Sequence, residues 1–179
     1  MATTSRNGIT KTPLPQRCIG QFDWAENFIE SQRERIDPRF RENAYNYNLS
    51  NFLYEKEEER QALRVLQTVE FTDVYYGLSA RSLLLKIYYE QEDVEALIAL
   101  FGSFRTYLTR NQLVSAYQRE VHQNLIAFTR KAHQLRLNRP QRTTPAFRKK
   151  VADLKTEIET AGQVTNASWL LEQVDGLVA

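Results

Sequence analysis

The sequence predicts an all-α protein, built from antiparallel helix pairs that stack as a short α-solenoid with capping helices at the C-terminal end. Three observations predict this class. Glu, Gln, Leu, Arg, Ala and Lys, which favour helices, dominate the composition, and the 179 residues include only 6 Gly and 5 Pro. Apolar residues recur at helical spacings of three and four along most of the chain. The apolar pattern also repeats along the sequence.

The N-terminal part is expected to combine a flexible segment with a first helix. Residues 1–20 are polar and show no period, so we expect them to be flexible. Asp23 and Glu26 have the spacing of a capping box, which satisfies the free N–H groups at a helix start. This pattern predicts a helix from Trp24 to about Ile36.

Four further helices are expected before residue 111. Asp37 followed by Pro38 is typical of a helix start, and the helix that follows should run to about Glu55. The next helices should begin after the acidic turn 57–59, at Thr72–Asp73 and after Asp93. In chain order, the apolar stripes of the four helices are Ala44, Leu49, Phe52 and Leu53; Ala62, Leu63, Leu66 and Val69; Leu83, Leu84, Ile87 and Tyr88; and Ala96, Leu97, Leu100 and Phe104.

The C-terminal third is expected to hold three helices. One long helix should run from about Gln112 to Leu137, followed by a basic loop at 138–144. Thr144 with Pro145 should start the next helix, Gly162 should close it, and Asn166 can cap a short last helix. Their stripes are Leu113, Tyr117, Val121, Leu125, Phe128, Ala132 and Leu135; Phe147, Val151, Leu154, Ile158 and Ala161; and Trp169, Leu170, Val174 and Leu177.

The repeat is visible when the chain is compared with itself. Ala62 and Ala96 lie 34 residues apart, and a small residue at this position lets two helices approach closely. The same shift places Leu49 on Leu83, Leu53 on Ile87, Tyr54 on Tyr88, Glu59 on Asp93, Leu63 on Leu97 and Leu66 on Leu100. Stacked units of this kind build one continuous core and a curved surface.

Residues 43–76 and 77–110 therefore resemble two tetratricopeptide repeats, and 21–42 resemble the second helix of an earlier one. The match is partial: the aromatic usual early in the first helix is Asn46 and Ala80, and the usual closing proline is absent. The stretches NAYNYNLSNFLY, QTVEFTDVYYGLSARSLLLKIYYE and SWLLEQV also resemble uncharacterised bacterial proteins of this type. We expect one helical-repeat domain over 21–179, with 111–137 as a long helix and 144–179 as capping helices.

The resemblance implies a protein-binding scaffold, because the first helix of each pair lines a concave groove that holds a peptide or protein. The matching positions here are Tyr47, Asn48, Asn51, Tyr54, Arg81, Tyr88, Tyr89 and Arg119, with Glu55, Ser82, Leu85, His122 and Gln123 at further groove positions. Tyrosine and arginine are common interface anchors, and asparagines can clamp a peptide backbone. The alternative is that Tyr54 and Tyr88 are half-buried packing residues.

A basic segment provides a second candidate surface. It contains eight cations and no acidic residue, namely Arg130, Lys131, Arg136, Arg139, Arg142, Arg148, Lys149 and Lys150. Such a segment could bind nucleic acid or another polyanion through phosphate contacts. Two observations favour a plainer interpretation: aromatic residues for base stacking are absent, and the segment could pair with acidic residues such as those at 57–59.

No enzymatic activity and no cofactor are expected. His122 and His133 lie 11 residues apart, which separates them by about 16 Å along a helix, too far to share a metal ion. Cys18 is the single cysteine, and no glycine-rich phosphate loop is present. Catalytic and metal-binding residues are therefore not assigned.

The charge and hydropathy pattern predicts a cytoplasmic protein. The net charge is only +2, and no apolar run reaches the length of a signal peptide or of a membrane span. A protein or peptide partner is expected. Self-association is a further possibility, because the incomplete N-terminal repeat would leave a stacking face near Trp24 without a neighbour.

Overall fold

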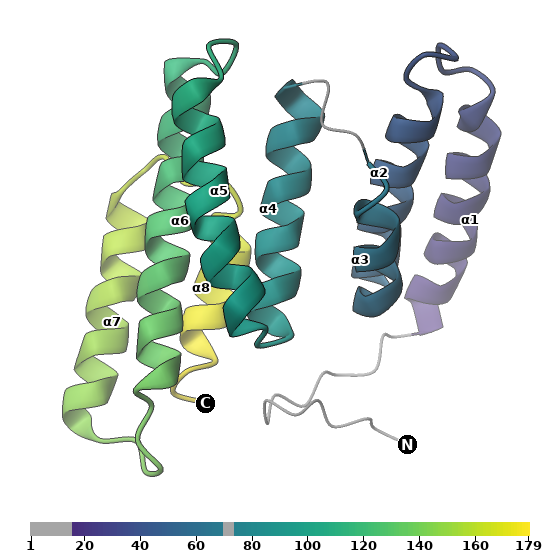
Figure 1. Cartoon of the computed structure of the whole chain (residues 1–179). Coiled ribbons are helices and arrows are strands. Elements are labelled where there is room, and N and C mark those ends of the chain that lie inside the picture. Colours follow the sequence, from purple (N-terminus) through teal and green to yellow (C-terminus); the bar gives the residue numbers. More distant parts are fainter. Residues whose placement is uncertain (1–15, 70–73) are drawn as a thin grey trace. The chain divides into compact units, whose positions relative to one another are not determined.

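Every regular element in the computed structural model is an α-helix over the residues that it describes, 16–69 and 74–179 (Figure 1). The helices are α1 (Gln16–Arg33), α2 (Arg41–Glu55), α3 (Glu59–Leu66), α4 (Val74–Glu90), α5 (Val94–Arg110), α6 (Ala116–Leu137), α7 (Pro145–Thr160) and α8 (Ala167–Asp175). The prediction of an all-α protein is confirmed. The chain divides into two compact units, unit 1 (Met1–Gln91) and unit 2 (Glu92–Ala179). The boundary falls inside the expected repeat 77–110, and a single continuous array stays a prediction.

Unit 1 is built from α1 to α4. Helix α1 packs along α2, α2 packs against α3, and α4 contacts both α2 and α3. The core consists of Phe52, Leu53, Ala62, Leu66, Val69, Ala80, Leu83 and Ile87, and all of these are buried. Because the apolar positions expected for the middle of the chain supply this core, the helical periodicity located the buried faces correctly.

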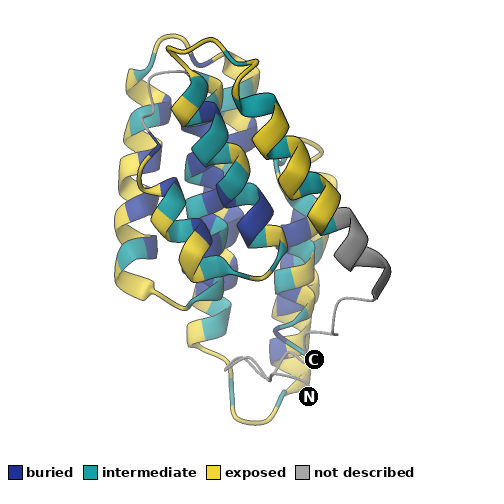
Figure 2. Ribbon diagram, turned by 90° about the vertical axis from the view of Figure 1, so that its right-hand side faces the viewer, coloured by how far each residue is buried: buried dark blue, intermediate teal, exposed yellow. Residues whose placement is uncertain are grey.

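Unit 2 is organised around α6, the longest helix. Helix α6 contacts α5, α7 and α8, and α7 also packs on α8. Buried positions follow one side of most helices, whereas α4 buries residues on two opposite sides (Figure 2). The expected stripe of α6 is largely buried, as are Phe147, Val151, Leu154 and Ile158 of α7. Leu113 and Tyr117 are exposed instead: Leu113 precedes the helix, which starts at Ala116 and not at Gln112, and Tyr117 lies in its first turn.

The two predicted helix starts near the N-terminus are wrong. Helix α1 begins at Gln16, so Asp23 and Glu26 lie in its interior and residues 16–20 belong to the helix. Asp37 and Pro38 lie in a turn, where the Asp37 carboxylate accepts a hydrogen bond from the Arg39 amide at 3.0 Å. Residues 1–15 and the expected start at Thr72–Asp73 lie outside the described residues.

Side-chain caps fix the starts of three helices in unit 2. Asp93 accepts from the Ala96 amide at 3.0 Å, and Thr144 accepts from the Phe147 amide at 3.2 Å, as the sequence predicted. Ser115 forms a complete capping box with Gln118, which the sequence interpretation missed although the spacing shows it. Asn166 occupies the N-cap of α8 but makes no side-chain cap bond, so its predicted capping role is wrong.

The two expected repeats have turns of equal length between their helices, residues 56–58 and 91–93, and each turn has one left-handed residue, Glu57 and Glu92. The N-caps that follow, Glu58 and Asp93, lie 35 residues apart (93 − 58 = 35), one more than the 34-residue alignment. The alignment therefore pairs positions of the second helices that are one residue out of step. As a result Ala62 is buried but Ala96 is only half-buried, so the expected small-residue match between these alanines is wrong.

Gly162, which was expected to close α7, has a left-handed backbone with φ of 66°. A β-carbon there would meet nothing within 4 Å, so only backbone strain opposes a larger residue. Gly162→Ala should lower the free energy of unfolding by about 1 kcal/mol. Gly102 in α5 is the matched control: it also has open space around it, but its backbone is helical.

Gly102→Ala should raise the free energy of unfolding by about 1 kcal/mol, because alanine has the higher helix propensity. Urea denaturation followed by circular dichroism measures both changes. Equal signs for the two substitutions would contradict the assigned backbone conformations.

Candidate functional site

The first candidate surface is the α2–α4 face of unit 1. The Tyr47 ring meets the Tyr76 ring edge-on, with centroids 5.4 Å apart. The Tyr54 hydroxyl donates to the Glu90 carboxylate at 2.7 Å. The first contact joins the middle of α2 to the start of α4 and the second joins the ends of both helices, so α2 and α4 run parallel. Tyrosines thus tie the two helices together at two points.

Tyr54 has both a packing role and a polar role. Its ring packs against the core of unit 1, and the Lys86 ammonium lies 4.2 Å from the ring centroid, within cation–π distance. Burial, together with the Glu90 carboxylate, raises the pKa of Tyr54 above its usual range. The phenol therefore stays protonated and donates to Glu90.

The remaining groove residues of α2 are placed differently from one another. Asn48 is exposed. Asn51 is half-buried, and its side-chain amide donates to the Tyr47 carbonyl at 2.9 Å. Asn48 and Asn51 are three residues apart, so they lie on the same side of the helix. Glu55 at the end of α2 is also exposed. These residues form an uninterrupted polar strip beside Tyr47.

Tyr88 and Arg81 do not share the face of α4 that Tyr54 contacts. Tyr88 follows Lys86 by two residues, which turns it by about 200° around the helix axis. The Arg81 guanidinium donates to the Gly77 carbonyl at 2.9 Å on the same helix. Although the 34-residue shift aligns Tyr54 with Tyr88, the structure therefore does not bring Tyr54 together with Tyr88 or Arg81. α4 instead presents Lys86 and Glu90 to Tyr54.

Four expected groove residues are buried and cannot contact a partner from these positions. They are Ser82, Leu85, Tyr89 and His122. The sequence interpretation placed them by analogy with repeat positions, which does not predict burial.

Arg119 is half-buried in unit 2 and has an internal role. Its guanidinium donates to the Leu108 carbonyl in the last turn of α5 and to the Val114 carbonyl at 3.3 Å. Carbonyls at the end of a helix lack partners within the helix, so this arginine caps α5. Arg119 thus has a structural role, and its expected groove role stays a prediction. Gln123 of the same helix is exposed.

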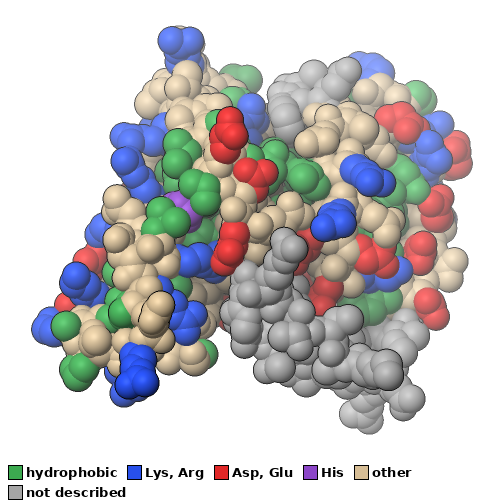
Figure 3. Space-filling view, turned by 60° about the horizontal axis from the view of Figure 1, so that its bottom comes forward, with side chains coloured by type: hydrophobic (Ala, Val, Ile, Leu, Met, Phe, Trp, Pro, Cys, Tyr) green, Lys and Arg blue, Asp and Glu red, His purple; other side chains and the backbone are tan. Residues whose placement is uncertain are grey.

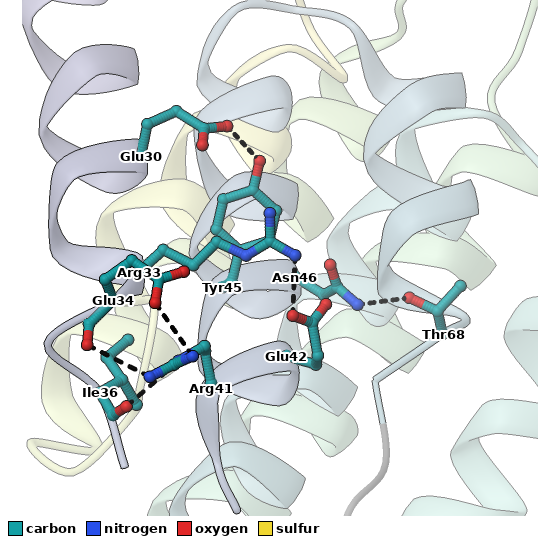
Figure 4. A network of polar contacts seen from close by, with 9 residues as sticks. All are labelled: Glu30, Arg33, Glu34, Ile36, Arg41, Glu42, Tyr45, Asn46 and Thr68. Atoms are coloured by element: carbon teal, nitrogen blue, oxygen red, sulfur yellow. Dashed lines mark hydrogen bonds and ion pairs between the residues drawn. The ribbon is translucent and has the colours of Figure 1, made fainter. Parts of the chain in front are cut away.

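A polar network that the sequence interpretation missed joins α1 to α2 (Figure 4). Arg33 forms an ion pair with Glu42 at 2.7 Å and lies over the Tyr45 ring, while the Tyr45 hydroxyl donates to Glu30. Further contacts are Arg41 with Glu34 at 3.1 Å and Asn46 with Thr68 at 3.1 Å. These partners are 7 to 22 residues apart along the chain, and Glu34 and Thr68 lie just after the ends of α1 and α3, so no local spacing rule could find them. Exposed pairs of this kind contribute little stability each.

The second candidate surface is the basic segment of unit 2. It covers the second half of α6, the connecting loop and the start of α7, and Lys and Arg side chains are spread over the left-hand side of Figure 3, where these helices lie. Several of the cations have internal partners. Lys131 pairs with Glu157, Lys149 pairs with Asp153 at 2.8 Å, Arg136 lies 3.9 Å from Glu92, and Arg139 donates to the Ala179 carbonyl at 3.0 Å.

A hollow of about 590 Å³ lies between α6 and α7 within this segment. Leu135 and Leu154 contribute apolar surface, and polar or charged groups make up the rest of its lining, namely Lys131, Gln134, Asn138, Lys150, Asp153 and Glu157. Lys131 and Glu157 mark one end of the hollow. Lys150 and Asn138 mark the other, because the two helices run antiparallel.

Both histidines are buried in α6. The His122 Nδ1 atom lies 2.6 Å from the Gln118 carbonyl, and burial lowers the pKa of His122. Burial also lowers the pKa of His133, with a further contribution from the Arg136 charge, against an opposing effect of Glu92. Over the described ranges no three acidic, cysteine or histidine side chains cluster in a way that could hold a metal ion.

Within the described part of the chain, no helix combines the length and apolarity needed to cross a membrane. Comparison of the sequence and structure with protein-family models, curated proteins and solved structures finds no match. Function is therefore inferred from the two surfaces above.

Proposed function

We propose that this chain is a non-catalytic, tetratricopeptide-like module that binds a peptide segment of another protein on the α2–α4 face. The observation that supports the proposal is the pair of tyrosine contacts, Tyr47 with Tyr76 and Tyr54 with Glu90, because they hold two parallel helices in a fixed relation. A surface that is ordered before binding loses less conformational entropy when a partner arrives.

The chemistry of the face suits an extended peptide. Asn48 offers a free carboxamide, which can both donate to and accept from a peptide backbone. Tyr75 of α4 is 64% exposed and its ring lies 5.7 Å from that of Tyr76, so aromatic surface is available beside the polar strip. Exposed tyrosine is a residue type that commonly anchors interfaces.

Site-specific photo-crosslinking in native lysate tests the proposal. A photoreactive phenylalanine analogue at Asn48 should form an adduct with a distinct protein. The same analogue at Asn27, an exposed asparagine of α1, is the matched control and should not. Identical adducts at both positions, or none at Asn48, would contradict the proposal.

The affinity for the captured partner provides the second measurement. Asn48→Arg combined with Tyr75→Arg changes two exposed side chains, so the fold should persist. Binding should weaken by about tenfold or more, the loss expected when interface residues worth roughly 1.4 kcal/mol are removed. Unchanged affinity would exclude the α2–α4 face as the contact surface.

A further inference from the structure

The basic segment of unit 2 separates into neutralised and free cations. Lys131, Arg136 and Lys149 each lie beside a carboxylate. Among the described residues, no acidic side chain pairs with the exposed cations Arg130, Arg142, Arg148 and Lys150. The eighth cation, Arg139, donates to the Ala179 carbonyl instead. The four cations that pair with neither a carboxylate nor a carbonyl in the described part of the chain are therefore Arg130, Arg142, Arg148 and Lys150, which we call the free cations.

The free cations gather toward one end of the α6–α7 hairpin. Arg142 lies in the connecting loop, and Arg148 and Lys150 lie in the first two turns of α7. Arg130 lies on α6, about 10 Å along the helix from its end at Leu137. Lys150 also lines the end of the α6–α7 hollow that is nearest the loop. Arg148 and Lys150 are two residues apart, which places them about 200° apart around the axis of α7. The free cations are therefore spread over more than one side of the hairpin, which does not suit a single small anion.

Local electrostatics adds to this charge. The N-terminus of a helix carries a partial positive charge, so cations in the first turns of α7 raise the local potential instead of relieving it. Lys149 reduces the effect through Asp153, but Arg148 and Lys150 have no such partner among the described side chains. A bound polyanion would neutralise both the side chains and the helix terminus.

We propose that the free cations bind the sugar–phosphate backbone of double-stranded nucleic acid without sequence preference. Three of the four are arginines, whose planar guanidinium forms paired hydrogen bonds with phosphate oxygens. Phe128 and Phe147 are buried, so the aromatic residues of the segment cannot stack on the bases of a single strand. Leu137 is the one large apolar side chain exposed in the described part of the segment, which is too little for insertion into a membrane surface.

This inference is independent of the proposed protein-binding function. The α2–α4 face belongs to unit 1 and the free cations belong to unit 2. Variants of one surface leave the other unchanged, so either proposal can fail alone.

Fluorescence anisotropy of a short labelled duplex of arbitrary sequence, titrated with the full chain at several salt concentrations, tests the inference. For four phosphate contacts, the logarithm of the binding constant should fall with the logarithm of salt concentration with a slope of about −3.6. Arg130→Gln, Arg142→Gln, Arg148→Gln and Lys150→Gln combined should abolish most of this slope and weaken low-salt binding at least about tenfold.

The matched control removes the same charge elsewhere. Arg60, Arg64, Arg105 and Arg110 are exposed arginines on α3 and α5, and changing all four to glutamine should leave binding nearly unchanged. Undetectable binding of the wild-type chain at low salt would overturn the inference. So would an equal loss in the control variant, or binding to phosphatidylserine vesicles without binding to the duplex.

Discussion

Phe104→Ala should lower the free energy of unfolding by about 3–5 kcal/mol, a larger change than any other substitution considered above. Phe104 lies on α5 with 0% of its surface exposed, and its ring meets the His122 ring edge-on with centroids 5.7 Å apart. Its truncation removes buried apolar surface, leaves a cavity and breaks the aromatic pair. Urea denaturation measures the loss.

Tryptophan fluorescence makes the urea measurement specific to the unfolding of unit 2. Trp169 is buried in unit 2, whereas Trp24 of unit 1 is 66% exposed, so the fluorescence change on unfolding should come mainly from Trp169. Phe104→Ala should shift the Trp169 transition to lower urea. Ile98→Ala on the same helix is the control, since Ile98 is 58% exposed and should cost only about 0.5 kcal/mol. Equal shifts for both variants would contradict the assigned core.

Acidification from pH 7 to pH 5 should destabilise the protein through its two buried histidines. The folded-state pKa values of His122 and His133 are lowered, and burial is the first cause in both. Below an unfolded-state pKa of about 6.5, the unfolded chain binds more protons than the folded chain. The contribution of each histidine to the free energy of unfolding is therefore fully present above that pH. Below it, the free energy of unfolding falls by up to about 1.4 kcal/mol per pH unit for each histidine.

The comparison that isolates this effect uses His122→Gln and His133→Gln, singly and together. Each single variant should reduce the pH dependence of the free energy of unfolding between pH 7 and pH 5. The double variant should be nearly flat over the same range. A double variant as sensitive to acid as the wild-type chain would show that carboxylates, not these histidines, cause the loss.

Helix ends could be predicted where one residue and its immediate neighbours determine the backbone. Asp93 and Thr144 cap their helices through an amide three residues ahead, and Gly162 provides the left-handed residue after α7. Such contacts are contained in the local sequence. The spacing of Asp23 and Glu26 fits a cap equally well, yet it lies inside α1, because a local pattern does not exclude continuation of the helix upstream.

The candidate sites depended on tertiary contacts that the sequence does not encode locally. Arg119 is of a residue type that is common in binding sites, but its guanidinium reaches the end of α5 and donates there. Lys131 is neutralised by Glu157, which is 26 residues away along the chain. The left-handed residues Glu57 and Glu92 of the two turns lie 35 residues apart (92 − 57 = 35), so the 34-residue alignment matched positions on different sides of α3 and α5.

The order in which the helices pack has a consequence for the rate of folding. Within each unit, the contacts between described helices join elements that are one or two places apart in the chain, such as α2 with α3 or α6 with α8. Contacts between near neighbours require short loops to close, so the entropy lost before stabilising contacts form is small. Proteins with such low contact order fold in microseconds to milliseconds. The helices that emerge first from the ribosome can therefore pack on one another while the rest of the chain is still being synthesised.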